Sequence, residues 1–547
     1  MQKRWALIIL FVVAGVLRLY NLGYSDYQGD EIKAFYVSQS ETEDTAALAA
    51  VLPNPKEDAS VQFFLEQRKG PMQFLVTALL RGVSNDYQDR ALVRLPFALA
   101  GLGSVIVFYY LTKLLFNDKV AFYSSIFFAT NGFLIAFSRI VQYQTLVIFF
   151  GLLAIYLTKK YVDLRQPHFL VAASISLAVS ILSHYDGAFF IPIILGLLYR
   201  LFRPAWVPQH SRRGFRISPP APRIAVEPSP SFRTFIISML LFLILTGAFY
   251  VPFVLNIAQS TTDYWAGRIS GDVSGKISSS RYLFSVYQPI YVLHVYTILG
   301  IVGFALVVMS IIYNIFPQPV TGLLWRVFKI KTLDGSYAPF NTSTLLSVLV
   351  WFLIPFVLLE VVVYIPGTHI YTYLIPAFLF VGFAVFYADL MVRKICSPVS
   401  FVIPAGVWLL FSFLTLQSYY VFVDHTFEYP WENKKFLIWT FPKPTPIFHL
   451  SMFGFPYYRH WDEIGDYIES NWQTDFYTTN ERVSISRYHI TLNKDGEKAG
   501  YYVYIKDPQT FTNEITNDRI SAWVQNNQPI VQYKNQNRVV SEIHFVR

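Results

Sequence analysis

The sequence predicts an α-helical polytopic membrane protein with about eleven transmembrane helices and a small C-terminal extracytoplasmic α/β domain. Composition is the first observation: 54% of the 547 residues are hydrophobic and 14% are charged, whereas soluble domains carry about 25% charged residues. The second is a series of apolar segments of about 20 residues, the length that spans a bilayer. The third is a polar, alternating pattern in the last part of the chain, which indicates strands outside the membrane.

Several of the apolar segments are interrupted by a charge or a proline. The expected spans cover approximately 5–22, 93–115, 119–137, 143–158, 168–184, 187–202, 234–257, 291–314, 344–365, 370–391 and 400–423. Lys3 and Arg4 precede the first span, as in a signal peptide, but no small-residue cleavage site follows. We therefore expect this segment to be a retained helix.

The distribution of lysine and arginine predicts the orientation. These residues fall in alternate loops, which places the N-terminus in the cytoplasm of a cell with a plasma (inner) membrane. The loop at 23–92 is acidic on balance and is then outside, as is the C-terminal region. The net charge of +9 reflects these orienting residues, so we expect no nucleic-acid partner. With Cys396 as its single cysteine, the chain has no intrachain disulfide.

Changes in composition divide the chain into three parts. We expect a transmembrane domain at 1–424, an interfacial connector at 425–454 and an extracytoplasmic soluble α/β domain at 455–547. Within the first part, the external loop 23–92 carries juxtamembrane helices, and the Pro/Arg-rich loop 203–233 is a flexible cytoplasmic segment because it lacks the apolar residues for a core.

Two adjacent carboxylates, Asp30 and Glu31, follow the first span closely. A carboxylate at this place suits a general base that deprotonates an acceptor; the alternative interpretation is capping of a helix N-terminus. In the same loop, Lys69 precedes Gly70-Pro71. Its ammonium group suits a phosphate, and the alternative is an ordinary cation that reaches to the membrane surface.

Further polar residues lie in the predicted outside turns, on the same side of the membrane as Asp30. Each is weak evidence alone, and their concentration on one side predicts a site there. These candidate substrate-binding residues are Arg139, Gln144, His184, His369, Tyr371 and Tyr373.

An ordered set of short motifs runs through residues 1–200, with a weaker echo at 366–390. The motifs are Arg18-Leu19, Asp30-Glu31, Lys69-Gly70-Pro71-Met72, Arg94-Leu95-Pro96, Tyr109-Tyr110-Leu111-Thr112-Lys113, Ser138-Arg139 and Tyr373-Leu374-Ile375-Pro376. In this order they resemble the GT-C superfamily, in particular the protein O-mannosyltransferase and aminoarabinose-transferase-like integral membrane glycosyltransferases.

The resemblance implies a helical membrane core whose cavity opens to the outer leaflet. A polyprenyl-phosphate sugar is the implied donor, and a lipid, protein or glycan is the acceptor. Asp30 is the implied catalytic base of an inverting transfer, while Lys69, Arg139 and His184 hold the donor phosphate. His184 replaces the lysine that is common at the end of the fifth span.

Two departures from the family pattern concern a metal. Gln144 stands where the family commonly has Asp, and Arg68 where it often has Glu. Both argue against a carboxylate-bound metal, so we assign no metal ligand, although a divalent metal ion stays open as a cofactor. The alternative function is a transporter or flippase of lipid-linked sugars. It calls for ionisable residues at mid-bilayer, and the nearest candidates, Asp186 and Glu360, lie near span ends.

Overall fold

The computed structural model describes most of the chain. The described residues are 2–35, 70–84, 87–202, 232–257, 259–271, 294–315, 340–395, 397–426, 428, 435–436, 439–440, 454–509 and 518–547. Lys69, nearly all of the loop 203–233 and most of the connector 425–454 lie outside these residues, so the predictions for them stay predictions.

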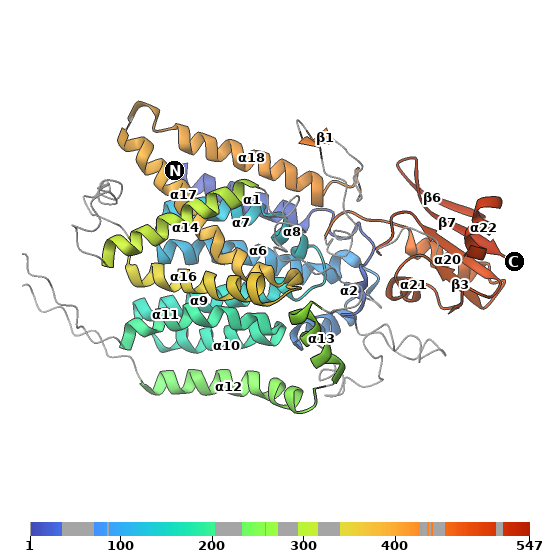
Figure 1. Ribbon diagram of the computed structural model, residues 1–547, viewed down its shortest axis with the longest axis horizontal. Coiled ribbons are helices and arrows are strands. Elements are labelled where there is room, and N and C mark those ends of the chain that lie inside the picture. Colours follow the sequence, from blue (N-terminus) through green and yellow to red (C-terminus); the bar gives the residue numbers. More distant parts are fainter. Residues whose placement is uncertain are drawn as a thin grey trace, which may run out of the picture.

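Long helices form a bundle with its axes roughly side by side (Figure 1). The N-terminus lies toward one end of this bundle, and the C-terminal domain lies beyond the other. The helices are α1 (Gln2–Leu19), α6 (Arg90–Leu115), α7 (Asp118–Thr130), α8 (Gly132–Ser138), α9 (Gln144–Leu164), α10 (Pro167–Ser183), α11 (Ile191–Phe202), α12 (Phe232–Leu255), α14 (His294–Ile315), α16 (Thr342–Val357), α17 (Tyr371–Ile395) and α18 (Val402–Phe422).

All the expected spans fall on helices, which confirms the helical membrane class. Among the described residues, seven helices are long and apolar enough to cross a membrane, and the pair α7 and α8, bent by 61°, makes up to eight. α10 is a shorter apolar helix, and so is the segment Tyr185–Tyr199, which includes most of α11. The expected count of eleven is therefore not confirmed.

The bend between α7 and α8 was not predicted, because the sequence was interpreted there as one span over 119–137. Asn131 leaves the helical conformation, with φ −68° and ψ 125°. Its side-chain oxygen accepts hydrogen bonds from the amides of Phe133 and Leu134 at 3.1 and 3.3 Å. An asparagine N-cap starts a new helix in this way, so α8 lies at an angle to α7. Arg139 follows the end of α8.

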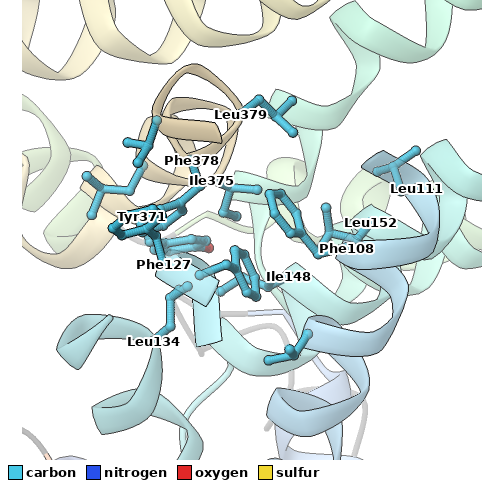
Figure 2. Packing of buried hydrophobic residues seen from close by; sticks show 14 of the residues in the cluster. Phe108, Leu111, Phe127, Leu134, Ile148, Leu152, Tyr371, Ile375, Phe378 and Leu379 are labelled. Atoms are coloured by element: carbon cyan, nitrogen blue, oxygen red, sulfur yellow. The ribbon is translucent and has the colours of Figure 1, made fainter. Parts of the chain in front are cut away.

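Aromatic and aliphatic side chains fill the centre of the bundle. Figure 2 shows Phe108, Phe127 and Leu134 converging with Tyr371 and Phe378, from α6, α7, α8 and α17. The Phe108 ring stacks on Phe128 with centroids 4.3 Å apart. Such close packing fixes the positions of these helices and therefore of the loops that join them.

The C-terminal domain has a five-stranded sheet in the order β4-β3-β5-β7-β6. β3 pairs in parallel with both β4 and β5, whereas β5, β7 and β6 are antiparallel. Its elements are α20 (Trp461–Ser470), β3 (Phe476–Thr479), α21 (Val483–His489), β4 (Asn493–Lys494), β5 (Gly500–Ile505), α22 (Asp518–Asn526), β6 (Val531–Asn535) and β7 (Arg538–Val546); a short pair, β1 (Lys435–Phe436) and β2 (Trp439–Thr440), precedes them.

Buried polar contacts join this domain to the start of the first loop. The Asp26 carboxylate accepts a hydrogen bond from the amide of Arg459 at 2.6 Å and lies 3.0 Å from the Arg90 guanidinium. Burial raises the pKa of Asp26, and Arg90 opposes this shift. Tyr27 and Trp461 belong to one hydrophobic cluster, so the two parts share a core and pack as one body.

Candidate functional site

Three of the predicted polar residues, His184, His369 and Tyr371, meet around the buried carboxylate of Asp186. The Oδ2 atom of Asp186 lies 2.7 Å from His369 Nδ1 and accepts a hydrogen bond from the Tyr371 hydroxyl at 2.8 Å. Its Oδ1 atom lies 3.2 Å from His184 Nδ1. All four residues are buried. We call Asp186, His184, His369 and Tyr371 the Asp186 cluster.

The two histidines that contact Asp186 come from two separate segments of the chain. α10 ends at Ser183. The next residue, His184, has an extended backbone (φ −166°, ψ 147°), and its Nδ1 accepts the amide hydrogen of Asp186 at 3.2 Å. The short helix Tyr185–Phe190 then begins. On the other side, the single turn Gly367–Ile370 leads into α17. It carries His369 and places Tyr371 in the first turn of α17.

An arginine that sequence reasoning missed completes this environment. Arg268 lies on α13 (Gln259–Ser270), at the end of the bundle that faces the C-terminal domain (Figure 1). Its Nη1 lies 3.2 Å from His369 Nε2, and its Nε donates to the carbonyl of Ile365 at 2.9 Å. The backbone of Ile365 in turn donates to the carbonyl of Arg268 at 3.0 Å. Gly367, with φ +58°, has no side chain and so leaves room for the guanidinium.

The turn after α8 lies against the same cluster. The Tyr143 ring stacks on His184 with centroids 4.1 Å apart. The Gln144 amide nitrogen lies 3.4 Å from the Thr368 hydroxyl. The structure thus brings together Gln144, His184, His369 and Tyr371 from the predicted set, with Asp186 at the centre.

The remaining candidates lie in other surroundings. The Tyr373 hydroxyl donates to Glu360 at 2.5 Å rather than to Asp186. Arg139 donates to the carbonyls of Leu17, Tyr20 and Asn21 at 3.2, 2.9 and 3.1 Å. Its guanidinium therefore satisfies backbone groups at the end of α1, a contact that accounts for its burial.

Asp30 and Glu31 differ sharply in their surroundings. Both belong to α2 (Gly29–Ile32). Glu31 is fully buried and accepts two hydrogen bonds of 2.8 Å from Arg94, with others from the amides of Gln28 and Val141 at 2.9 Å. Asp30 is partly exposed. The structure thus places Glu31 in a buried ion pair, and Asp30 is the more exposed of the two carboxylates.

The glycine of the motif Lys69-Gly70-Pro71-Met72 is required by close backbone packing. A Cβ atom at this position would collide with the carbonyl of Leu182 and approach Ser183. Only glycine permits this approach of two backbones. The contact fixes the residue after Lys69 against the segment that immediately precedes His184.

Comparison with known proteins identifies the general class. Residues 68–212 match the family model of dolichyl-phosphate-mannose-protein mannosyltransferase. This match supports the assignment of the chain to the membrane glycosyltransferases of the GT-C superfamily. No curated protein matches it in sequence. The resemblance inferred from the ordered motifs is thereby confirmed, and the match favours sugar transfer over transport.

Solved structures of other membrane glycosyltransferases are similar to this one. Apo ArnT from Cupriavidus metallidurans shares 11% identity over 99% of this chain and 98% of that chain, with a TM-score of 0.47. The apo oligosaccharyltransferase from Archaeoglobus fulgidus shares 13% over 90% of this chain and 64% of that chain, with a TM-score of 0.46. At these identities and scores, neither likeness bears on the substrate of the transferase.

Proposed function

We propose that this glycosyltransferase transfers a sugar from a polyprenyl-phosphate donor to a lipid, protein or glycan acceptor at the extracytoplasmic face, with inversion and with Asp30 as the general base. Support for the donor class comes from the family model, whose description names a dolichyl-phosphate sugar. The observation that carries the proposal is the partly buried Arg268 guanidinium beside His369, at the helix ends that face the C-terminal domain.

The guanidinium suits a phosphate for two reasons. It is planar and permanently charged, and its hydrogen-bond donors match phosphate oxygens. In addition, the acceptors near Nη1 are the neutral His369 ring nitrogen at 3.2 Å and the Tyr264 hydroxyl at 3.4 Å, and an anionic oxygen is a stronger acceptor than either. A donor phosphate at Arg268 would thus gain a charge-assisted hydrogen bond, and Lys69 and His184 are the further candidates to contact it.

The proposed reaction is a single displacement. The acceptor hydroxyl or amine attacks the anomeric carbon as its proton passes to the Asp30 carboxylate. The bond between this carbon and the phosphate oxygen breaks, and polyprenyl phosphate leaves with the electron pair. Attack opposite to the leaving group inverts the anomeric centre. Arg268 stabilises the charge that develops on the phosphate, an effect that fixed cations supply efficiently.

Transfer of radiolabelled sugar from polyprenyl-phosphate donors to a membrane extract tests this proposal. We expect Asp30→Asn to lower the transfer rate by about 10²–10⁴-fold, the usual contribution of a general base, while donor binding persists. Asp263→Asn is the matched control, because Asp263 is an exposed carboxylate of α13, on the same side of the bundle. Equal rates for the intact protein and Asp30→Asn would exclude Asp30 as the base.

A further inference from the structure

We propose that the Asp186 cluster, together with Gln144, binds one divalent transition-metal ion, Zn²⁺ or Mn²⁺. The ligands are Nδ1 of His184, Nδ1 of His369, the carboxylate of Asp186 and the side-chain oxygen of Gln144. This site goes beyond the proposed transfer reaction and does not depend on it, because it follows from the arrangement of the four side chains alone.

Distances within the cluster fit a metal ion. His184, Asp186 and His369 each offer a ligand atom, and these atoms all lie within 4.8 Å of one another. Around a tetrahedral zinc ion with bonds of about 2.0–2.1 Å, neighbouring ligand atoms are roughly 3.3 Å apart. The observed separations between carboxylate oxygen and ring nitrogen are 3.2 Å for His184 and 2.7 Å for His369. Small shifts of the His369 ring would therefore complete the geometry.

Two hydrogen-bond acceptors face each other at His184. The single lone pair of its Nδ1 accepts the amide hydrogen of Asp186 at 3.2 Å. The Oδ1 atom of Asp186 presents another at 3.2 Å. Both groups are buried, where repulsion between acceptors is poorly screened. Either a hydrogen on Nδ1 or a metal ion bound to both atoms would remove this repulsion, and each would displace the amide contact.

The side chain of Gln144 distinguishes a hydrogen on His184 from a bound metal ion. This side chain is 2% exposed, and its oxygen has no hydrogen-bond partner among the described residues. Its amide nitrogen lies 3.4 Å from Thr368, the residue before His369, while the neighbouring Tyr143 ring stacks on His184. The amide therefore borders the cluster. A hydrogen on His184 leaves this oxygen without a partner, whereas a metal ion would be bound by this oxygen, the Asp186 carboxylate and the two ring nitrogens.

The ligand types select the kind of metal. Imidazole nitrogens bind first-row transition metals well, whereas Mg²⁺ and Ca²⁺ prefer sites built of oxygen atoms. Two imidazoles, a carboxylate and an amide oxygen thus favour Zn²⁺ or Mn²⁺. Of the four ligands, Gln144 alone stands where the family commonly has a carboxylate, and it contributes a neutral oxygen instead.

Arg268 and the metal ion compete for His369. Because a guanidinium group only donates hydrogen bonds, its contact at 3.2 Å requires Nε2 of His369 to accept. The ring hydrogen then lies on Nδ1, directed at Asp186. A metal ion on Nδ1 moves this hydrogen to Nε2, and Arg268 has to turn away. Metal binding therefore frees the guanidinium, which would then be available to a donor phosphate if the proposed function holds.

Metal content of the full chain, purified in detergent without a histidine tag, tests the site. The protein is stripped with a chelator, equilibrated with Zn²⁺ or Mn²⁺, desalted and analysed by elemental mass spectrometry. We expect the intact protein to retain one equivalent, and Asp186→Asn and His369→Gln to bind at least ten-fold more weakly. His544→Gln is the matched control, since it removes a buried histidine of the C-terminal domain, and it should bind as the intact protein does.

Two further variants guard against misfolding as the cause of metal loss. Gln144→Glu supplies a charged oxygen and Arg268→Met removes the competing cation, so both should bind the metal at least ten-fold more tightly. A misfolded protein would not show this gain. Equal metal content in the intact protein and Asp186→Asn, or no retained metal in the intact protein, would overturn the proposal and indicate a protonated His184. No sugar donor is present, so this result is independent of the transfer assay.

Discussion

Replacing Glu31 by glutamine separates a structural role from a catalytic one. Glu31 is fully buried, and both of its carboxylate oxygens bind Arg94 at 2.8 Å. Arg94 is itself 2% exposed, so it has no access to water if its partner is removed. The Glu31→Gln variant keeps the size of the side chain and one acceptor oxygen but leaves the Arg94 charge buried and unbalanced.

The expected loss follows from this geometry. Removing one partner of a buried ion pair destabilises a protein by about 3–5 kcal/mol, because the other charge stays desolvated. We therefore expect Glu31→Gln to lower the free energy of unfolding, measured by denaturant titration in mixed micelles, by about this amount. Asp30→Asn, which changes a partly exposed residue, should change it by less than about 1 kcal/mol.

The double variant Glu31→Gln with Arg94→Met is the internal control. It removes both charges, so that no buried charge is left without its counter-ion. Stability should therefore recover in part relative to Glu31→Gln alone. A loss below about 1 kcal/mol for Glu31→Gln, or no recovery in the double variant, would refute the structural role of this pair and return Glu31 to the catalytic candidates.

Two further predictions concern packing and pH. Gly70→Ala should lower the yield of folded protein and its unfolding temperature, because the added Cβ collides with the rigid backbone at Leu182; an unchanged unfolding temperature would contradict this close approach. Burial lowers the pKa of His544, and the Glu542 carboxylate, 3.6 Å away, opposes this shift less strongly. As the pH drops below about 6.5, His544 therefore binds a proton more readily in the unfolded chain than in the folded domain. The free energy of unfolding should then fall with the pH, by at most about 1.4 kcal/mol per pH unit. His544→Gln should reduce this slope in unfolding measurements between pH 7 and 5, and an unchanged slope would argue against the shift.

The membrane helices could be predicted from the sequence because the length of an apolar segment is a local property. The bend at Asn131 could not, since an asparagine within an apolar run gives no sign that it will cap a new helix. In the C-terminal domain, the alternating segments identified β5, β6 and β7, whereas the short strand β4 has only two residues and carries no periodic signal.

Parts of the site could be predicted because helix ends on one side of a membrane share one surface. His184, His369 and Tyr371 were selected for this reason, and the structure places them together. The central Asp186 and Arg268 were not selected, because their roles depend on contacts with residues 183 and 101 positions away in the chain. Local sequence does not encode such pairs.

The same limit explains why Asp30 and Glu31 could not be told apart from the sequence. The partner of Glu31, Arg94, lies 63 positions later, and its motif Arg94-Leu95-Pro96 gave no indication of a partner. The family resemblance named Asp30 as the base, and this role stays a prediction; the structure shows that Glu31 is bound to Arg94 and that Asp30 is the more exposed of the two.

Release of polyprenyl phosphate from a radiolabelled polyprenyl-phosphate sugar tests the central claim most directly. The intact protein and Arg268→Met are reconstituted into vesicles with acceptor extract and compared, with Asp263→Asn as the control. We predict release by the intact protein and the control, and a reduction of at least about ten-fold in Arg268→Met, because a charge-assisted hydrogen bond of about 1.5–3 kcal/mol is lost. Equal release by the intact protein and Arg268→Met would contradict phosphate binding at this arginine. An absence of release from every such donor by correctly folded protein would contradict the donor class itself.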